Sequence, residues 1–93
     1  MEIVRIIWLE DLVEKLLWKH QVVEQEVIEV FENRPRFQRK EPGLKPGEDV
    51  YAAFGQTDAG RMLSVFFVYT LDKRAIIVSA RDMSQKEMKK YAK

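Results

Sequence analysis

Two arginines are the residues of this sequence best placed for chemistry on a phosphate group. Arg61 follows Gly60 at the start of an apolar run, and Arg81 closes a second run of the same kind. A guanidinium binds a phosphate through two parallel hydrogen bonds and stabilises negative charge that grows on it during a reaction. The alternative for Arg81 is an ion pair at a strand edge, with an acid such as Asp82 or Glu48.

Four further residues are candidates for moving protons. His20 is the one histidine of the chain, and Lys19 precedes it. A lone histidine that extends an apolar stripe is more often a helix C-terminal group bonded to a backbone carbonyl than a base. Glu87 is also explained by a helix capping box, and Tyr91 by packing on the sheet. Both interpretations stay open for each of these residues.

The positive charge of the chain is concentrated after residue 32. Residues 1–32 hold eight acidic and three basic residues, whereas residues 33–93 hold seven acidic and thirteen basic ones, although the whole chain is nearly neutral at +1. This asymmetry predicts a polyanion contact in the second part, or simply two solvated faces of opposite sign. The residues predicted to bind nucleic acid are Arg36, Arg39, Lys40, Lys86 and Lys89.

Several kinds of site are excluded by what the sequence lacks. It has no cysteine, which rules out disulfides and thiolate metal sites and is compatible with a reducing, cytoplasmic location. It has no acidic cluster or histidine pair at metal-ligand spacing, and the glycines at 55–60 lack the lysine and following helix of a phosphate-binding loop. We therefore expect no metal and no cofactor. No apolar run is long enough to form a membrane-spanning helix.

The elements that must position these residues centre on a β-hairpin of two apolar runs, at residues 60–69 and 74–81. Both runs are rich in β-branched and aromatic residues, and residues 72–73 between them suit a two-residue turn. Such a turn pairs Ser64 with Arg81. The predicted core face is Leu63, Val65, Phe67, Tyr69, Ile76, Val78 and Ala80, and the predicted open face is Met62, Ser64, Phe66, Val68, Thr70, Ala75, Ile77, Ser79 and Arg81.

The other elements follow from hydrophobic periodicity and from stop signals. Pro35 ends the second helix, because the residue before a proline resists helical geometry. Ser84 and Glu87 form a capping box that specifies the C-terminal helix. The predicted elements are a strand at 2–8, helices at 9–19 and 23–32, a loop at 34–47 with an extended piece at 36–39, strands at 50–54, 60–69 and 74–81, and a helix at 85–92.

These elements predict a single α+β domain over residues 1–93. It has an N-terminal strand and two helices, then a three-stranded antiparallel meander and a C-terminal helix, with the helices mostly against one sheet face. Several short motifs along almost the whole chain resemble the BrnT family of toxins. They are Lys19-His20, Arg34-Pro35-Arg36-Phe37, Gly60-Arg61 ahead of a strand, and Ser79-Ala80-Arg81 followed by Glu87 and Tyr91.

The resemblance implies a ribonuclease toxin of a type II toxin-antitoxin pair, with a fold similar to that of the RelE toxins. It implies an RNA substrate and a cognate antitoxin protein, with which the chain forms a hetero-oligomer. It favours phosphate binding by Arg61 and Arg81. Gln21 stands where the family usually has glycine after its Lys-His pair.

The predicted function is metal-independent RNA cleavage in the cytoplasm, in which the ribose 2′-hydroxyl attacks the adjacent phosphodiester. One alternative is a module of the same fold that binds RNA or an antitoxin without cleavage. Another is a structural subunit whose open sheet face docks a partner helix. An antitoxin is expected to cover an apolar patch of Met62, Phe66 and Ile77, or the basic loop beside it.

Overall fold

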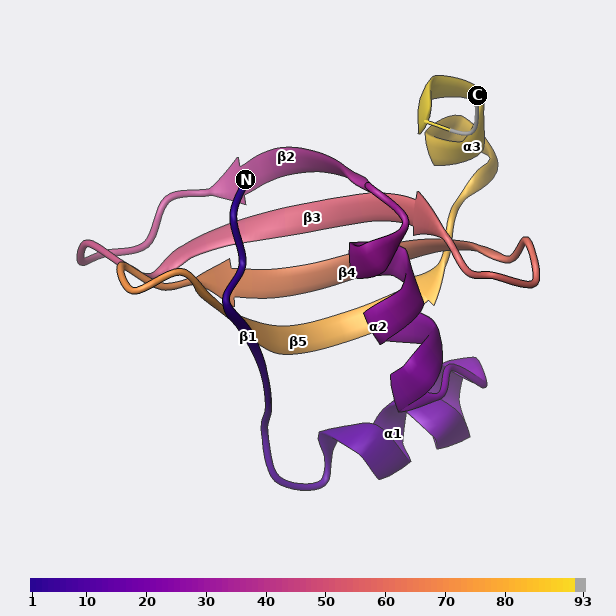
Figure 1. Ribbon diagram of the computed structural model, residues 1–93, viewed down its shortest axis with the longest axis horizontal. Coiled ribbons are helices and arrows are strands. Elements are labelled where there is room, and N and C mark those ends of the chain that lie inside the picture. Colours follow the sequence, from indigo (N-terminus) through magenta and orange to yellow (C-terminus); the bar gives the residue numbers. More distant parts are fainter. Residues whose placement is uncertain (92–93) are drawn as a thin grey trace.

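Five strands and three helices form within residues 1–91, which are the residues that the computed structural model describes (Figure 1). Ala92, the last residue of the predicted C-terminal helix, lies outside them. The helices in this part of the chain are far too short to cross a bilayer. In chain order the elements are β1 (Arg5–Trp8), α1 (Leu12–His20), α2 (Glu24–Glu32), β2 (Arg36–Glu41), β3 (Asp49–Gln56), β4 (Met62–Tyr69), β5 (Arg74–Asp82) and α3 (Gln85–Tyr91).

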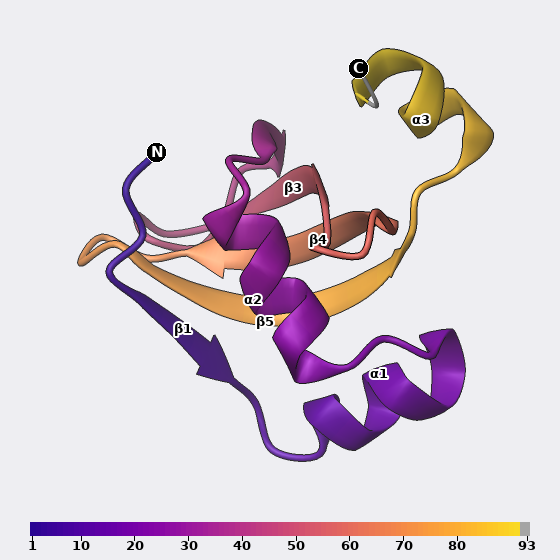
Figure 2. The ribbon, with the colours of Figure 1, turned by 45° about the vertical axis from the view of Figure 1, so that its right-hand side comes forward.

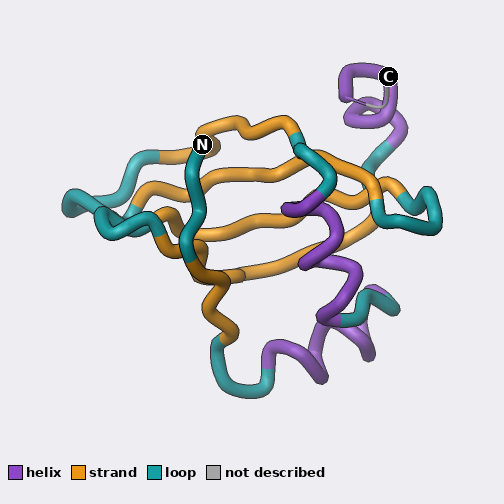
Figure 3. Tube along the Cα trace, in the orientation of Figure 1, coloured by secondary structure: helices purple, strands orange, loops and turns teal. Residues whose placement is uncertain are grey.

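The strands form one mixed sheet in the order β1-β5-β4-β3-β2 (Figure 3). Strand β1 runs parallel to β5, and the other neighbours are antiparallel. The predicted meander of three strands therefore gains a fourth. The extended piece predicted at 36–39 forms the first four residues of β2, where Gln38 pairs with Ala52 of β3. Pro35 precedes the strand at a place where its missing N–H leaves the ladder intact.

Helices α1 and α2 lie over one face of the sheet, and α3 follows the far end of β5 (Figure 2). The apolar stripes of the first two helices supply buried Leu16 and Val30 to the main core, where they meet Phe67 of β4. Phe31 packs edge-on against Phe67 with 5.3 Å between ring centroids. On the opposite face a smaller cluster forms from Ala52, Phe54 and Met83, with Met62, Phe66 and Tyr91 packed against it.

The turn between α1 and α2 depends on a left-handed residue. Gln21 has φ 53°, and its N–H donates to the Leu17 carbonyl at 3.0 Å, while the Val22 N–H donates to the Leu16 carbonyl at 3.2 Å. These two bonds end α1 in the manner that most favours glycine, which explains why glycine suits this position. Val22 is fully buried directly after the turn. This burial positions the start of α2 over the main core.

The register of the β4–β5 hairpin differs from the prediction near its turn. The turn is one residue longer than predicted, because the Thr70 N–H donates to the Arg74 carbonyl at 3.0 Å. A β-bulge then places the extra residue, Val78, on β5. Beyond the bulge Ser64 pairs with Arg81, as predicted.

The longer turn and the bulge thus compensate each other beyond Val78. Between the turn and the bulge, the residues of β5 face the opposite side of the sheet from the one predicted. Ala75 and Ile77 were assigned to the open face, but both are fully buried in the core. Val78 was assigned to the core and is 45% exposed. Ile77 is therefore absent from the apolar patch expected on the open face. The prediction fails here because a one-residue shift in pairing moves each side chain to the other face of the sheet.

The bulge can be tested by two matched truncations. Ile77→Ala is expected to lower the free energy of unfolding by about 2–5 kcal/mol, because it removes a fully buried side chain. Val78→Ala is expected to cost less than about 1 kcal/mol, because its side chain lies largely in solvent. Urea denaturation of both variants measures the difference. Equal losses, or a larger loss for Val78→Ala, would contradict the bulged register.

Candidate functional site

The predicted catalytic residues lie at one end of the sheet, where β4 begins and β5 ends. Leu63 pairs with Asp82 at this end. The sheet separates the residues into two groups, one on each face. The group on the side of α1 and α2 is Lys19, His20 and Arg61, and the group on the side of α3 is Arg81, Glu87 and Tyr91.

Arg61 is bound by three different elements of the protein. Its NH1 group donates to the Gln21 carbonyl at 2.7 Å and to both Glu26 oxygens at 3.1 and 3.2 Å. Its NH2 group donates to the His20 carbonyl at 3.0 Å. Its Nε donates to Asp82 Oδ1 at 2.7 Å. The guanidinium therefore joins the end of α1, the start of α2 and the end of β5.

These contacts support a structural role for Arg61. Two of its bonds satisfy carbonyls at the C-terminus of α1, where the helix itself leaves them without partners. Its side chain is only 26% exposed. The carboxylates of Asp82 and then Glu26 raise the pKa of Arg61 above its ordinary value. Because most of its donors are already engaged, Arg61 would have to leave this network before it could bind a phosphate.

Lys19 and His20 occupy the last turn of α1, beside the Arg61 network. Lys19 is exposed, and His20 is half-buried. The pKa of Asp82 lies below its ordinary value, mainly because Arg61 donates to it, and the nearby His20 adds to the effect. His20 thus lies near Asp82, and the contact it makes with Arg61 is through its backbone carbonyl and not its imidazole.

Arg81 makes a two-point contact with Glu87 on the other face. NH1 and NH2 of Arg81 donate to Glu87 Oε1 and Oε2 at 2.7 and 3.0 Å, and the guanidinium lies 5.1 Å from the centre of the Phe66 ring. NH1 also donates to the Asp82 carbonyl at 3.0 Å. Paired planar contacts of this kind fix the orientation of a guanidinium. Among the described residues no acceptor bonds to Nε, and the side chain is 36% exposed.

Within the described chain, the Glu87 carboxylate accepts hydrogen bonds from four donor atoms that belong to three residues. Besides Arg81, it accepts from Ser64 Oγ and from the Ser84 N–H, each at 2.9 Å. The Glu87 N–H in turn donates to Ser84 Oγ at 3.2 Å, which confirms the predicted capping box. Arg81 first, with these hydrogen bonds, lowers the pKa of Glu87 to about 2. So weak a base is poorly matched to taking a proton at neutral pH.

A hollow of about 340 Å³ adjoins this pair, between α3 and strands β2 and β3. Tyr91 stacks face to face on Phe54, with ring centroids 4.0 Å apart and planes 5° from parallel. The Tyr91 hydroxyl donates to Gln38 Oε1 at 3.1 Å. Three lysines give the hollow a positive rim. The residues that line it are Gln38, Lys40, Phe54, Ser84, Lys86, Glu87, Lys90 and Tyr91.

The residues predicted to bind nucleic acid are only partly gathered at this hollow. Lys40 and Lys86 line it, and Lys40 lies 5.8 Å above the Phe54 ring. Arg36 and Lys89 are exposed but do not line it. Arg39 is engaged elsewhere, in an ion pair with Asp49 at 3.3 Å.

Sequence analysis missed several residues of these two networks. Lys90 lies four residues after Lys86, so helical spacing alone places both on one face of α3. Gln38 lies two residues from both Arg36 and Lys40, so the three share one face once 36–41 is recognised as a strand. Nothing in the sequence marks Glu26 as a partner of Arg61, because the two lie 35 positions apart.

Comparison with known proteins places the chain in a family. The sequence model described as "Ribonuclease toxin, BrnT, of type II toxin-antitoxin system" matches residues 8–87. The chain belongs to the BrnT family. A crystal structure of the ribonuclease toxin BrnT from Brucella abortus matches with a TM-score of 0.60 and 22% identity, covering 87% of this chain and 97% of that one. A search of curated proteins found no match.

The family confirms the coarse prediction made from the sequence motifs. BrnT proteins are ribonuclease toxins of type II toxin-antitoxin systems, a class that implies an RNA target and an antitoxin partner. The likeness to the Brucella structure concerns the fold, since the two sequences share 22% identity. The α+β architecture with three helices and a mixed sheet is thus the BrnT fold.

The structural role of Arg61 gives a clear expectation for stability. Arg61→Ala is expected to lower the free energy of unfolding by about 2–3 kcal/mol, since it removes charge-assisted hydrogen bonds and leaves Glu26 without its partner. Arg61→Lys should recover only part of this, because an ammonium cannot span three elements. Arg74→Ala, which breaks an exposed pair with Asp72, is the matched control and should cost less than about 1 kcal/mol. Urea denaturation that ranks Arg61→Ala with Arg74→Ala would contradict the structural role.

Acid titration tests the Glu87 network. The pKa of Glu87 is about 2 in the folded protein against an ordinary value of 4.5, so the folded state binds fewer protons than the unfolded one between these values. Its stabilisation is therefore complete above about pH 5 and lost as the pH falls toward 2. Glu87→Gln should lower the melting temperature at pH 7, with a deficit that shrinks on acidification. A deficit that stays constant from pH 7 to pH 2 would contradict the charged network.

Proposed function

We propose that this BrnT protein cleaves RNA without a metal ion, in the hollow beside Arg81. One observation carries the proposal. The Arg81 guanidinium is held in a fixed plane by Glu87 and Phe66, and Glu87 itself lines an opening rimmed by lysines. A preorganised cation in a partly closed site stabilises charge better than one that must first reorganise.

The reaction needs only groups that the RNA and the protein supply. The ribose 2′-hydroxyl attacks the adjacent phosphorus, its proton passes to a base, and the bond to the 5′-oxygen of the next nucleotide breaks as that oxygen gains a proton. The products are a 2′,3′-cyclic phosphate and a free 5′-hydroxyl. Negative charge grows on the non-bridging oxygens during attack, so a guanidinium beside them lowers the barrier.

The predicted residues take different parts in this proposal. Arg81 faces the phosphate through its Nε–H and the remaining NH2 hydrogen. Lys40, Lys86 and Lys90 attract the phosphates of the strand, which is a sequence-independent contribution to affinity. Glu87 orients Arg81, and Tyr91 lines the hollow with its ring stacked on Phe54 and its hydroxyl bonded to Gln38. Lys19, His20 and Arg61 lie across the sheet, where Arg61 binds Asp82 at the end of β5 that carries Arg81.

The partner of the proposed enzyme is an antitoxin that blocks the hollow within a hetero-oligomer. The apolar patch expected for it is smaller than the sequence predicted, because Met62 and Phe66 pack against the cluster of Ala52, Phe54 and Met83, and Ile77 is buried on the other face. Basic residues around β2 remain exposed and suit an acidic partner. We place the protein in the cytoplasm with its RNA, and we infer that its arrangement resembles that of the RelE toxins.

Arg81 separates catalysis from binding. Arg81→Ala is expected to lower the cleavage rate by about a hundredfold, the loss typical of removing one preorganised donor, while RNA affinity changes far less. Arg81→Lys should restore only part of the rate, because it keeps the charge without the two-point geometry. The assay measures single-turnover cleavage and RNA binding of purified protein, with and without a chelator.

Arg74→Ala is the matched control, because Arg74 lies at the opposite end of β5 and pairs with Asp72. Its rate should equal that of the unmodified protein. A normal rate in folded Arg81→Ala would remove Arg81 from the mechanism. Equal losses of rate and affinity would make it a binding residue, and RNA binding without cleavage by the unmodified protein would establish the non-catalytic alternative. Loss of cleavage on chelation would contradict the metal-free reaction.

A further inference from the structure

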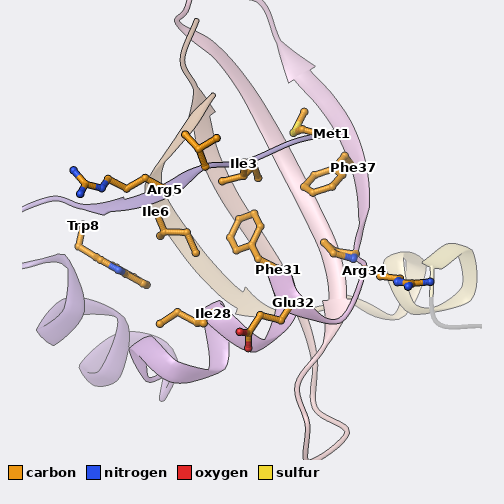
Figure 4. A pocket seen from close by; sticks show the side chains of 12 residues that line it. Met1, Ile3, Arg5, Ile6, Trp8, Ile28, Phe31, Glu32, Arg34 and Phe37 are labelled. Atoms are coloured by element: carbon orange, nitrogen blue, oxygen red, sulfur yellow. The ribbon is translucent and has the colours of Figure 1, made fainter. Parts of the chain in front are cut away.

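A second hollow lies on the face opposite α3 (Figure 4). It has a volume of about 780 Å³ and lies between the segment that leads into β1, helix α2 and the start of β2. Most of the side chains that line it are apolar, with Ile6, Trp8, Phe31 and Phe37 as the larger members. Arg5, Glu32 and Arg34 add charged groups to the lining. In Figure 4 the Met1 side chain lies beside Phe37, so the N-terminal segment reaches toward β2 across this face.

Strand β2 borders this hollow and has a free edge. It is the last strand of the sheet and pairs only with β3 among the described residues. Its other edge therefore presents backbone N–H and C=O groups that a further strand can pair with. A strand added there would extend the sheet beside β2, with one of its faces on the side of the hollow.

The two faces of β2 differ in the side chains they would offer to such a strand. Phe37 faces the apolar hollow, whereas Gln38 and Lys40 face the other way, toward α3. Arg36 shares the face of Gln38 by alternation and is exposed. Because cross-strand neighbours pair side by side, the added strand needs apolar residues on one face and acidic residues on the other.

We propose that the free edge of β2 binds an extended acidic segment of a partner protein by strand addition, with apolar side chains at alternate positions entering the hollow. Backbone hydrogen bonds supply affinity in this mode, and the alternating side chains supply specificity. The acidic residues of the segment lie beside Arg36 and Lys40. A second copy of this chain is a poor occupant, because two β2 edges would bring like charges together.

The binding mode also gives a way to block RNA. Lys40 lies on the rim of the hollow beside Arg81, so acids that approach it compete with phosphates for the same charge. This consequence rests on the proposed ribonuclease function, whereas the binding itself does not.

Synthetic peptides test the mode directly. The probe is a fluorescein-labelled decapeptide of alternating Glu and Val, titrated with the full-length protein and followed by fluorescence anisotropy. A Lys-Val peptide of equal length should bind at least tenfold more weakly. A Glu-Val peptide with N-methyl groups on alternate amides along one edge should also bind at least tenfold more weakly, because it cannot pair with a strand on that edge. Amide NMR shifts should be largest along β2.

Charge reversal supplies the matched variants. Arg36→Glu is expected to lower the affinity for the Glu-Val peptide by about tenfold. Arg74→Glu, which has the same net charge, is expected to leave that affinity unchanged. The proposal is overturned if Glu-Val peptides methylated along one edge and along the other both bind as tightly as the unmethylated peptide. It is also overturned if the amide shifts are centred on α3, or if no binding is seen at millimolar peptide. The same holds if an oligouridylate shifts the β2 amides and the Glu-Val peptide does not, since RNA is then the occupant.

RNA cleavage is measured on the same preparations, so that the two proposals fail separately. Peptide binding at β2 by a protein that does not cleave RNA would leave strand addition standing and overturn the ribonuclease proposal. Cleavage without peptide binding would do the reverse. Where both hold, the Glu-Val peptide should inhibit cleavage and the N-methylated peptide should not.

Discussion

The network around Arg61 is the contact on which the arrangement of both faces depends. One guanidinium meets the last carbonyls of α1, a carboxylate in the first turn of α2 and the last side chain of β5. Glu26 strengthens the same junction, since it also accepts the N–H of Val23 at 3.1 Å and so caps its own helix. Helix α2 has a separate polar contact through Glu29, which accepts the Asp58 N–H at 3.0 Å, but among the described residues the Arg61 network is the polar contact that joins both helices to β5.

Asp82 links this network to the other face of the sheet. Its carboxylate accepts from Arg61, and its carbonyl accepts from Arg81. The two arginines have the same chemistry but different surroundings. Arg61 is enclosed between helices and strand, whereas Arg81 lies over Phe66 beside an open hollow and keeps donors that no described residue uses. That difference in enclosure, rather than residue type, supports a catalytic part for one and a structural part for the other.

Most of the fold could be predicted from local patterns. Periodicity located all three helices within a few residues, and the capping box at Ser84 and Glu87 specified the start of α3. Two features were predicted incompletely or not at all. Strand β2 was predicted only as a short extended piece within a loop, because it lies in a stretch rich in proline and charge. It is a strand because β3 offers it a partner. The bulge at Val78 could not be predicted, because the longer turn and the extra residue together leave the pairing of Ser64 with Arg81 unchanged.

The sequence by itself determined the α+β class, the helix positions, the BrnT resemblance and the two arginines at the ends of strands. These depend on residue type and short spacing, which act within a few positions of the chain. Only the tertiary structure decided that Arg61 and Arg81 lie on opposite faces, that Glu26 pairs with Arg61, and that Gln38 accepts from Tyr91. Those partners are 35 positions from Arg61 and 53 from Tyr91. Contacts of such separation form when strands pair in one register and helices cross at one angle, and no local pattern in the chain encodes that choice.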